Sequence, residues 1–174
     1  MENYDTDRFN TAHFQSSVVN IHLCGYRNEK NEGDEDGNPP TNHWAAFLQY
    51  PSGGSARLDM APGYGSDGLR GKIDLASKPY MLTNNAIKSL SFSPKTPITV
   101  QSIVNTINSK GRDRYRFTAE WEGCRYWMYT FILDLESAGI LASGSGQATW
   151  QAVSYYWRNP SGFEPREVKR GRFY

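Results

Sequence analysis

Residues 42–62 read NHWAAFLQYPSGGSARLDMAP, and this stretch decides the fold. Two apolar arms, 43–50 and 55–61, flank the sequence PSGG (51–54), whose proline and glycines favour a tight turn. The pattern therefore predicts a β-hairpin. His43 heads the first arm, and Asp59 lies among the apolar residues of the second arm. A hairpin that serves only to cover a core needs neither side chain, so the pair indicates a functional site.

The segments around the hairpin predict further strands and three helices. Alternating apolar residues predict strands at 17–24, 68–77, 78–83, 88–93 and 115–121. Apolar residues at helical spacing and capping residues predict helices at 99–111, at 124–138, and from Ser145 through 147–159 until Pro160. These elements indicate the α+β class, with an antiparallel sheet packed on helices.

The length of 174 residues favours one domain, which we assign to residues 16–174. Residues 1–15 are expected to form a flexible N-terminus. The charged, glycine-bearing and proline-terminated segment 27–42 is expected to form a mobile loop that can act as a flap over His43.

Composition narrows the function classes. The formal charge of +1 gives no global sign of a nucleic-acid or membrane surface, and the apolar runs are shorter than a membrane span. The N-terminus has no signal-peptide pattern, and two cysteines make no disulfide framework, so we expect a cytoplasmic protein. No residue pattern predicts a metal site or a cofactor.

Cys124 lies at the predicted start of the second helix, directly after Gly123. A thiol in the first helical turn faces unpaired N–H groups and the positive end of the helix dipole, and both favour the reactive thiolate. Cys124, His43 and Asp59 would then form a nucleophile, a base and an orienting acid. The alternative is that Cys124 is a small buried apolar residue and that His43 makes only local hydrogen bonds. Aromatic and cationic neighbours add four candidate substrate-binding residues: Trp44, Arg57, Arg125 and Trp127.

The stretch HWAAFLQYPSGGSARLDMAP (43–62) and the stretch GCRYWMYTFILDL (123–135) resemble motifs of the lecithin:retinol acyltransferase-like family. That family belongs to the NlpC-like group of circularly permuted papain-like proteins. The resemblance implies such a fold, with His43 as the base, Asp59 as the polar orienter and Cys124 as the nucleophile. Asp59 replaces the family's usual histidine, and Gly123 replaces its usual asparagine. The family's apolar anchoring tail has no counterpart, which argues against a lipid substrate.

A second resemblance is to uncharacterised fungal proteins that carry NHW (here 42–44) and GCR followed by an aromatic residue and Trp (here 123–127). The leading hypothesis is a thiol hydrolase or acyltransferase that acts on a small-molecule or acyl substrate through a thioester. A non-catalytic small-molecule-binding domain of the same fold is an alternative. Another is an arginine-type cyclodipeptide synthase, in which basic clusters at 110–116 and 166–172 would contact aminoacyl-tRNA. The low net charge argues against that alternative.

Overall fold

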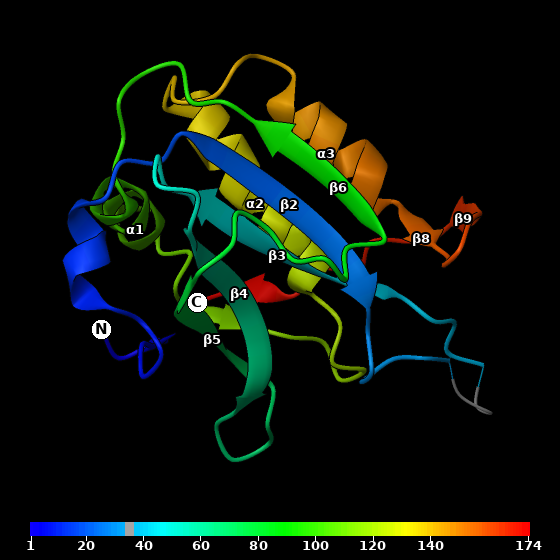
Figure 1. Ribbon diagram of the computed structural model, residues 1–174. Helices are drawn as coiled ribbons and strands as arrows, with labels where there is room; N and C mark the ends of the chain where they lie inside the picture. The colour runs from blue at the N-terminus through cyan, green and yellow to red at the C-terminus, as the bar shows by residue number, and fades with distance from the viewer. Residues whose placement is uncertain (34–36) are drawn as a thin grey trace.

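The computed structural model describes residues 1–33 and 37–174, and within them an eight-stranded twisted sheet forms the centre of the molecule (Figure 1). Its strand order is β10-β7-β5-β4-β3-β2-β6, and the short β1 lies beside β5. All neighbours are antiparallel except β1 and β5, which are parallel. The strands are β1 (Tyr4–Asp5), β2 (Asn20–Arg27), β3 (Asn42–Gln49), β4 (Ser55–Tyr64), β5 (Arg70–Lys78), β6 (Lys88–Phe92), β7 (Tyr115–Arg116) and β10 (Arg172–Phe173).

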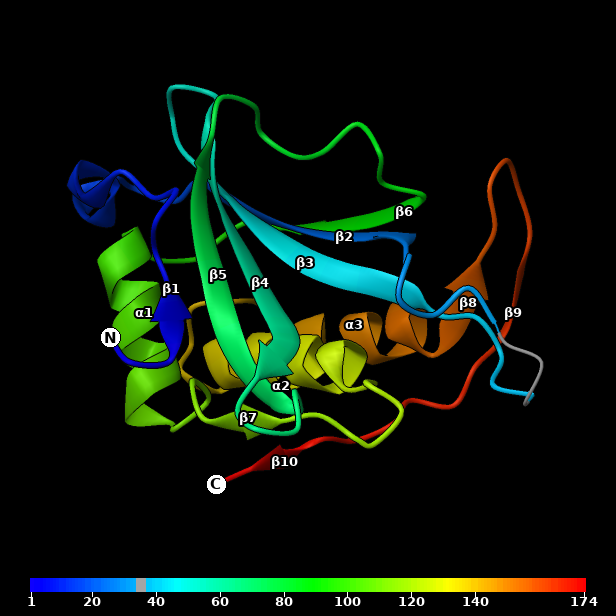
Figure 2. The same cartoon turned by 90° about the horizontal axis from the view of Figure 1, so that it is seen from below.

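Three α-helices accompany the sheet in the described part of the chain: α1 (Val100–Ser109), α2 (Cys124–Ser137) and α3 (Ser145–Val153). Figure 2 shows α2 and α3 on one side of the sheet. Thr99 caps α1 by a capping box with Ser102, which satisfies backbone N–H groups that the first helical turn leaves unpaired. The mixed α+β class with an antiparallel sheet is therefore confirmed. Large apolar side chains from the strands and helices join one core cluster between sheet and helices.

The predicted hairpin forms, but its two strands part at the end where the site lies. The β3–β4 pairing runs from Gln49↔Ser55 to Ala46↔Leu58 and then stops. Beyond that point β3 continues to pair with β2, and β4 continues to pair with β5. Figure 2 shows the two halves of the sheet diverging in a V, with α2 crossing below. The strong right-handed twist of β-strands accounts for such divergence.

Residues 1–15, which we predicted to be flexible, pack against the sheet instead. Tyr4 and Phe9 are buried in the core, and β1 pairs with β5. A 3-10 helix, η1 (Thr11–Gln15), follows. Isolated aromatic residues carry no periodicity, which explains why the sequence did not reveal this packing.

The third helix is shorter than predicted. It ends at Val153, and Ser154 donates its hydroxyl to the Trp150 carbonyl oxygen. The aromatic residues that follow form β8 (Tyr155–Trp157), which pairs with β9 (Phe163–Pro165) in a small second sheet. Aromatic side chains favour strands, and here the partner strand decides the outcome. The strand predicted at 78–83 does not form beyond Lys78, and only 115–116 of the segment 115–121 is a strand.

The predicted mobile loop, 27–42, includes residues 34–36, which lie outside the described residues. Near its ends Arg27 pairs with Glu32 at 2.6 Å, and the side chains of Asn28 and Asn31 donate to the Thr41 hydroxyl. The mobility of this loop stays a prediction. None of the helices in the described ranges combines the length and the apolar character that a bilayer crossing requires.

Candidate active site

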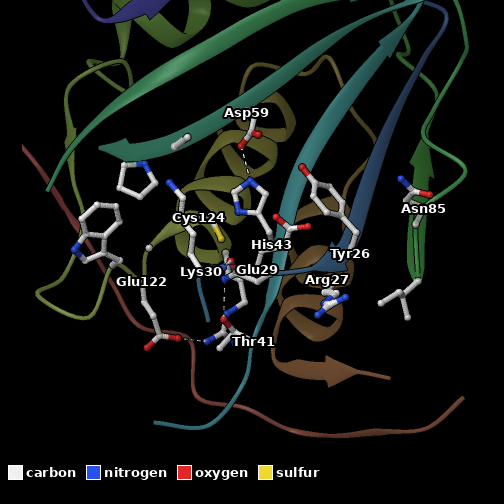
Figure 3. Close-up of a pocket in the computed structure, with 18 of the residues that line it drawn as sticks. Tyr26, Arg27, Glu29, Lys30, Thr41, His43, Asp59, Asn85, Glu122 and Cys124 are labelled. Atoms are coloured by element: carbon white, nitrogen blue, oxygen red, sulfur yellow. Dashed lines mark hydrogen bonds and ion pairs between the residues drawn. The ribbon is translucent and has the colours of Figure 1, made fainter. Parts of the chain in front are cut away.

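The structure brings the three predicted residues together in one pocket. The pocket has a volume of about 950 Å³ and lies at the open end of the β3–β4 hairpin. His43 comes from β3, Asp59 from β4 and Cys124 from the first position of α2, and all three line the pocket (Figure 3). The parting of the two strands creates the space into which the start of α2 fits.

The His43 ring lies between the other two residues. Its Nε2 donates to Asp59 Oδ1 at 2.7 Å, since an ionised carboxylate can only accept. The second ring nitrogen, Nδ1, is then left for Cys124, and Figure 3 shows the sulfur beside the ring on the side away from Asp59. The thiol and the ring lie close enough for each to shift the pKa of the other. The side chains of His43 and Asp59 are only 18% and 9% exposed, so water screens this chain of contacts weakly.

Each group of this chain favours the charged form of its neighbour. Burial opposes ionisation of Cys124, but the charge of His43 and hydrogen bonds from His43 and the Trp44 backbone N–H hold the pKa of the thiol below its ordinary value. Burial likewise opposes a charged imidazole, yet Asp59 and Cys124 raise the pKa of His43 well above its ordinary value. For Asp59, burial is outweighed by the charge and hydrogen bond of His43, and its pKa is lowered. Both shifts therefore favour a thiolate and an imidazolium over a neutral thiol and a neutral imidazole.

Gly123 allows Cys124 to occupy the helix start. Its φ is 152°, in the region that favours glycine, and a Cβ there would lie 3.0 Å from the Tyr115 ring. Tyr115 donates its hydroxyl to the Gly123 carbonyl oxygen at 2.9 Å. Within the described residues, the backbone N–H of Cys124 has no protein acceptor, as expected for the first turn of a helix. Such a group is free to donate to a negatively charged oxygen in the pocket.

Two of the predicted substrate-binding residues do not line the pocket. Trp44 is fully buried, and its ring lies against Gly25 of the neighbouring strand. Trp127 is also fully buried, stacks on Phe131 and donates its Nε1 to the Arg112 carbonyl oxygen. Both rings are used for core packing, which is the common role of large aromatic residues. For Trp44, the part near the site is the backbone N–H, which helps to lower the pKa of the Cys124 thiol.

The two predicted cationic residues are also held by protein contacts. Arg125 lines the pocket, but its side chain is only 4% exposed, and its guanidinium donates to the carbonyl oxygens of Val153, Arg166 and Glu167. It therefore fastens the end of α3 and the C-terminal segment to the start of α2. Arg57 is absent from the described pocket lining, and its guanidinium turns toward Asp74 and Asp59.

Other pocket residues were not predicted from the sequence. The ring of Tyr26 meets the His43 ring edge-on, with centroids 5.3 Å apart, because the two residues are partners in the β2–β3 register. Lys30 lies over the Trp121 ring at 5.3 Å, so the loop after β2 contacts the loop before α2 across the pocket. Glu122 also lines the pocket, and burial raises its pKa. Only the strand register could have revealed Tyr26, and the sequence does not specify it.

A protein-family model matches residues 21–174, and its description is Domain of unknown function (DUF7770). The chain belongs to this family. The matched region contains His43, Asp59 and Cys124, whereas β1 lies outside it. No curated protein and no solved structure matches the chain. The papain-like relationship and the fungal source therefore stay predictions.

Proposed function

We propose that this protein is a cysteine-dependent acyl-transfer enzyme with a circularly permuted papain-like fold. The observation that carries the proposal is the position of His43, which hydrogen-bonds Asp59 through Nε2 and contacts the Cys124 thiol at the start of α2. The order of the elements, with the histidine strand before the cysteine helix, agrees with the permuted arrangement. The pocket that the three residues line supplies room for a substrate.

In the proposed reaction, the Cys124 thiolate attacks a carbonyl carbon, and a C–S bond forms as the carbonyl oxygen becomes negatively charged. The Cys124 backbone N–H is in a position to donate to this oxygen. The tetrahedral intermediate collapses, the bond to the leaving amine or alkoxide breaks, and the His43 imidazolium gives its proton to the leaving group. His43 is then neutral and accepts a proton from water or an amine, which attacks the thioester and releases the acyl product and the thiolate.

Asp59 keeps the imidazole oriented and stabilises its protonated form throughout. Because it accepts from Nε2, it directs Nδ1 toward the sulfur. Tyr26 packs on the ring from β2 and restricts its rotation. We do not extend the proposal to tRNA, because Arg112, Arg116 and Arg166 of the basic clusters pair with acidic residues of the protein.

Acylation of the protein by p-nitrophenyl esters of short acids and by small aminoacyl esters tests the proposal. We expect a burst of p-nitrophenol and an acyl adduct on Cys124, which intact-mass and peptide mass spectrometry detect and hydroxylamine removes. Cys124→Ala should abolish burst and adduct, whereas Cys24→Ala should retain both. Absence of any adduct across the ester panel, or an unchanged burst in Cys124→Ala, would favour the binding-domain alternative.

A further inference from the structure

Arg57 of β4 lies beside Asp59, the acid of the candidate triad. Asp59 Oδ1 accepts from His43, and its other oxygen, Oδ2, lies 3.9 Å from Arg57 Nη2. The same Nη2 donates to Asp74 Oδ2 on β5, the strand next to β4. Asp74 Oδ2 in turn accepts from Arg8 at 2.7 Å. The charges therefore alternate in sign from the imidazole to the surface.

We infer that Arg57 is a positioning residue of the proposed catalytic site: its guanidinium, fastened to Asp74, holds the Asp59 carboxylate charged and turned toward His43. A carboxylate with one oxygen on a ring N–H and the other facing a guanidinium has little freedom to rotate. The inference rests on the proposed function only for the role of the Cys124 thiolate as a nucleophile.

The burial of Arg57 supports a role beyond surface ion pairing. Its side chain is 20% exposed, and its Nε is buried without a hydrogen-bond partner in the described part of the chain. A buried donor without an acceptor costs stability, and a position under structural selection alone would tend to avoid it. The strand alternation also places Arg57 on the same face as Asp59, two residues away, so β4 itself fixes their proximity.

The electrostatic effect has a definite sign. A cation near Asp59 favours its carboxylate form, and the pKa of Asp59 is lowered, although burial alone would raise it; His43 contributes most to the lowering, and Arg57 and Lys30 add to it. Removing the Arg57 charge should raise the pKa of Asp59 and, through the weakened imidazolium, that of Cys124. The titratable or charged groups that face the site are Tyr26 from β2, Lys30 from the following loop, His43 from β3, Asp74 from β5, Tyr115 from β7, and Glu122 and Arg125 near the start of α2.

The test measures the rate of Cys124 alkylation by iodoacetamide as a function of pH. The acidic limb of this profile is the pH range in which the rate falls because the Cys124 thiolate becomes protonated. In Arg57→Gln, this limb should move to a pH about one unit higher. The rate of labelling at a pH within the limb should then be about tenfold lower than in the wild type. Arg57→Lys should slow it about twofold to threefold, because an ammonium cannot face two carboxylates as a guanidinium does. Arg8→Gln is the matched control: Arg8 donates to the same Asp74 oxygen as Arg57, but it is 62% exposed and one charged group further from Asp59, so its loss should leave the limb unchanged.

A double-mutant cycle separates positioning from a structural effect. In the Asp59→Asn background, Arg57→Gln should produce almost no further shift, because the group through which Arg57 acts is gone. An equal shift in both backgrounds, or no shift in either, overturns the inference. If circular dichroism shows that Arg57→Gln does not fold, the test uses Arg57→Lys instead. A labelling rate of Arg57→Lys equal to that of the wild type then overturns the inference. Labelling by iodoacetamide requires no acyl transfer, so the two proposals can fail separately. If the cycle shows the expected coupling between Arg57 and Asp59 but no ester acylates the protein, the proposed enzyme activity is rejected and the positioning role of Arg57 is retained.

Discussion

Cys124 should react with iodoacetamide at neutral pH at least about one hundred times faster than Cys24, even if its thiol were no more acidic than an ordinary one. Cys24 lies in the middle of β2 with no exposed surface, and burial raises the pKa of its thiol to about 12. At pH 7 about one Cys24 in 10⁵ is then ionised, against about 3% of an ordinary thiol of pKa about 8.5. The ionised fractions differ by a factor of about 3,000.

Intrinsic nucleophilicity reduces this factor. A more basic thiolate is a better nucleophile, and a Brønsted slope of about 0.45 over about 3.5 pKa units restores about fortyfold to Cys24. About one hundredfold remains. The lowered pKa of Cys124 and the inaccessibility of Cys24 both increase the difference.

The assay is a time course of labelling followed by peptide mass spectrometry. Cys24→Ala should keep the fast phase and Cys124→Ser should lose it, while both cysteines should label alike in urea. Labelling of Cys24 within tenfold of Cys124 in the folded protein would refute the reasoning. A Cys124 rate that falls below pH 8.5 as that of an ordinary thiol does would leave the hundredfold factor intact and contradict only the lowered pKa of Cys124.

Three further substitutions test the site and its support. Asp59→Asn should lower the pKa of His43 and raise that of Cys124, so half-maximal alkylation should need a higher pH; a profile identical to wild type would assign Asp59 a structural role only. Gly123→Ala should lower the free energy of unfolding, measured in urea, by about 1–3 kcal/mol, and by more than Gly139→Ala does. Both glycines have a positive φ, but only at Gly123 would the added Cβ lie against Tyr115. Equal losses in the two variants would contradict this reasoning. Phe131→Ala should cost about 3–5 kcal/mol in the same assay, since the ring is buried against Trp127, and a loss below 1 kcal/mol would mean that the core refills the space.

The sequence predicted the parts of this molecule that depend on local patterns. The hairpin turn, the Thr99 cap of α1 and the start of α2 at Cys124 all agree with the structure, because turn residues and helical spacing act over a few neighbours. The proximity of His43 and Asp59 also agrees with the base and orienting acid that their residue types predicted. Their use in catalysis stays a prediction.

Features set by distant contacts could not be predicted in this way. Tyr155 begins a strand rather than a further helical turn because β9 is available to pair with it. A tryptophan can line a pocket or fill a core, and the sequence does not distinguish the two roles. Only the packing in the structure shows that Trp44 and Trp127 belong to the core. The engagement of Arg125 depends on carbonyl groups from α3 and the C-terminal segment, which are 28 to 42 residues away in sequence.

The parallel pairing of β1 with β5 also covers part of the outer edge of β5. Asn3 accepts from the Ile73 N–H, and Arg8 accepts from the Ser77 N–H through its carbonyl oxygen, so the N-terminal segment occupies hydrogen-bonding groups along the outer side of β5. The family region begins only at residue 21, and a fragment cut at that boundary would lose this cover together with two core aromatics. It would present an open strand edge beside exposed apolar surface, which is a template for pairing with another chain. Trimming the protein to its family boundary should therefore favour aggregation.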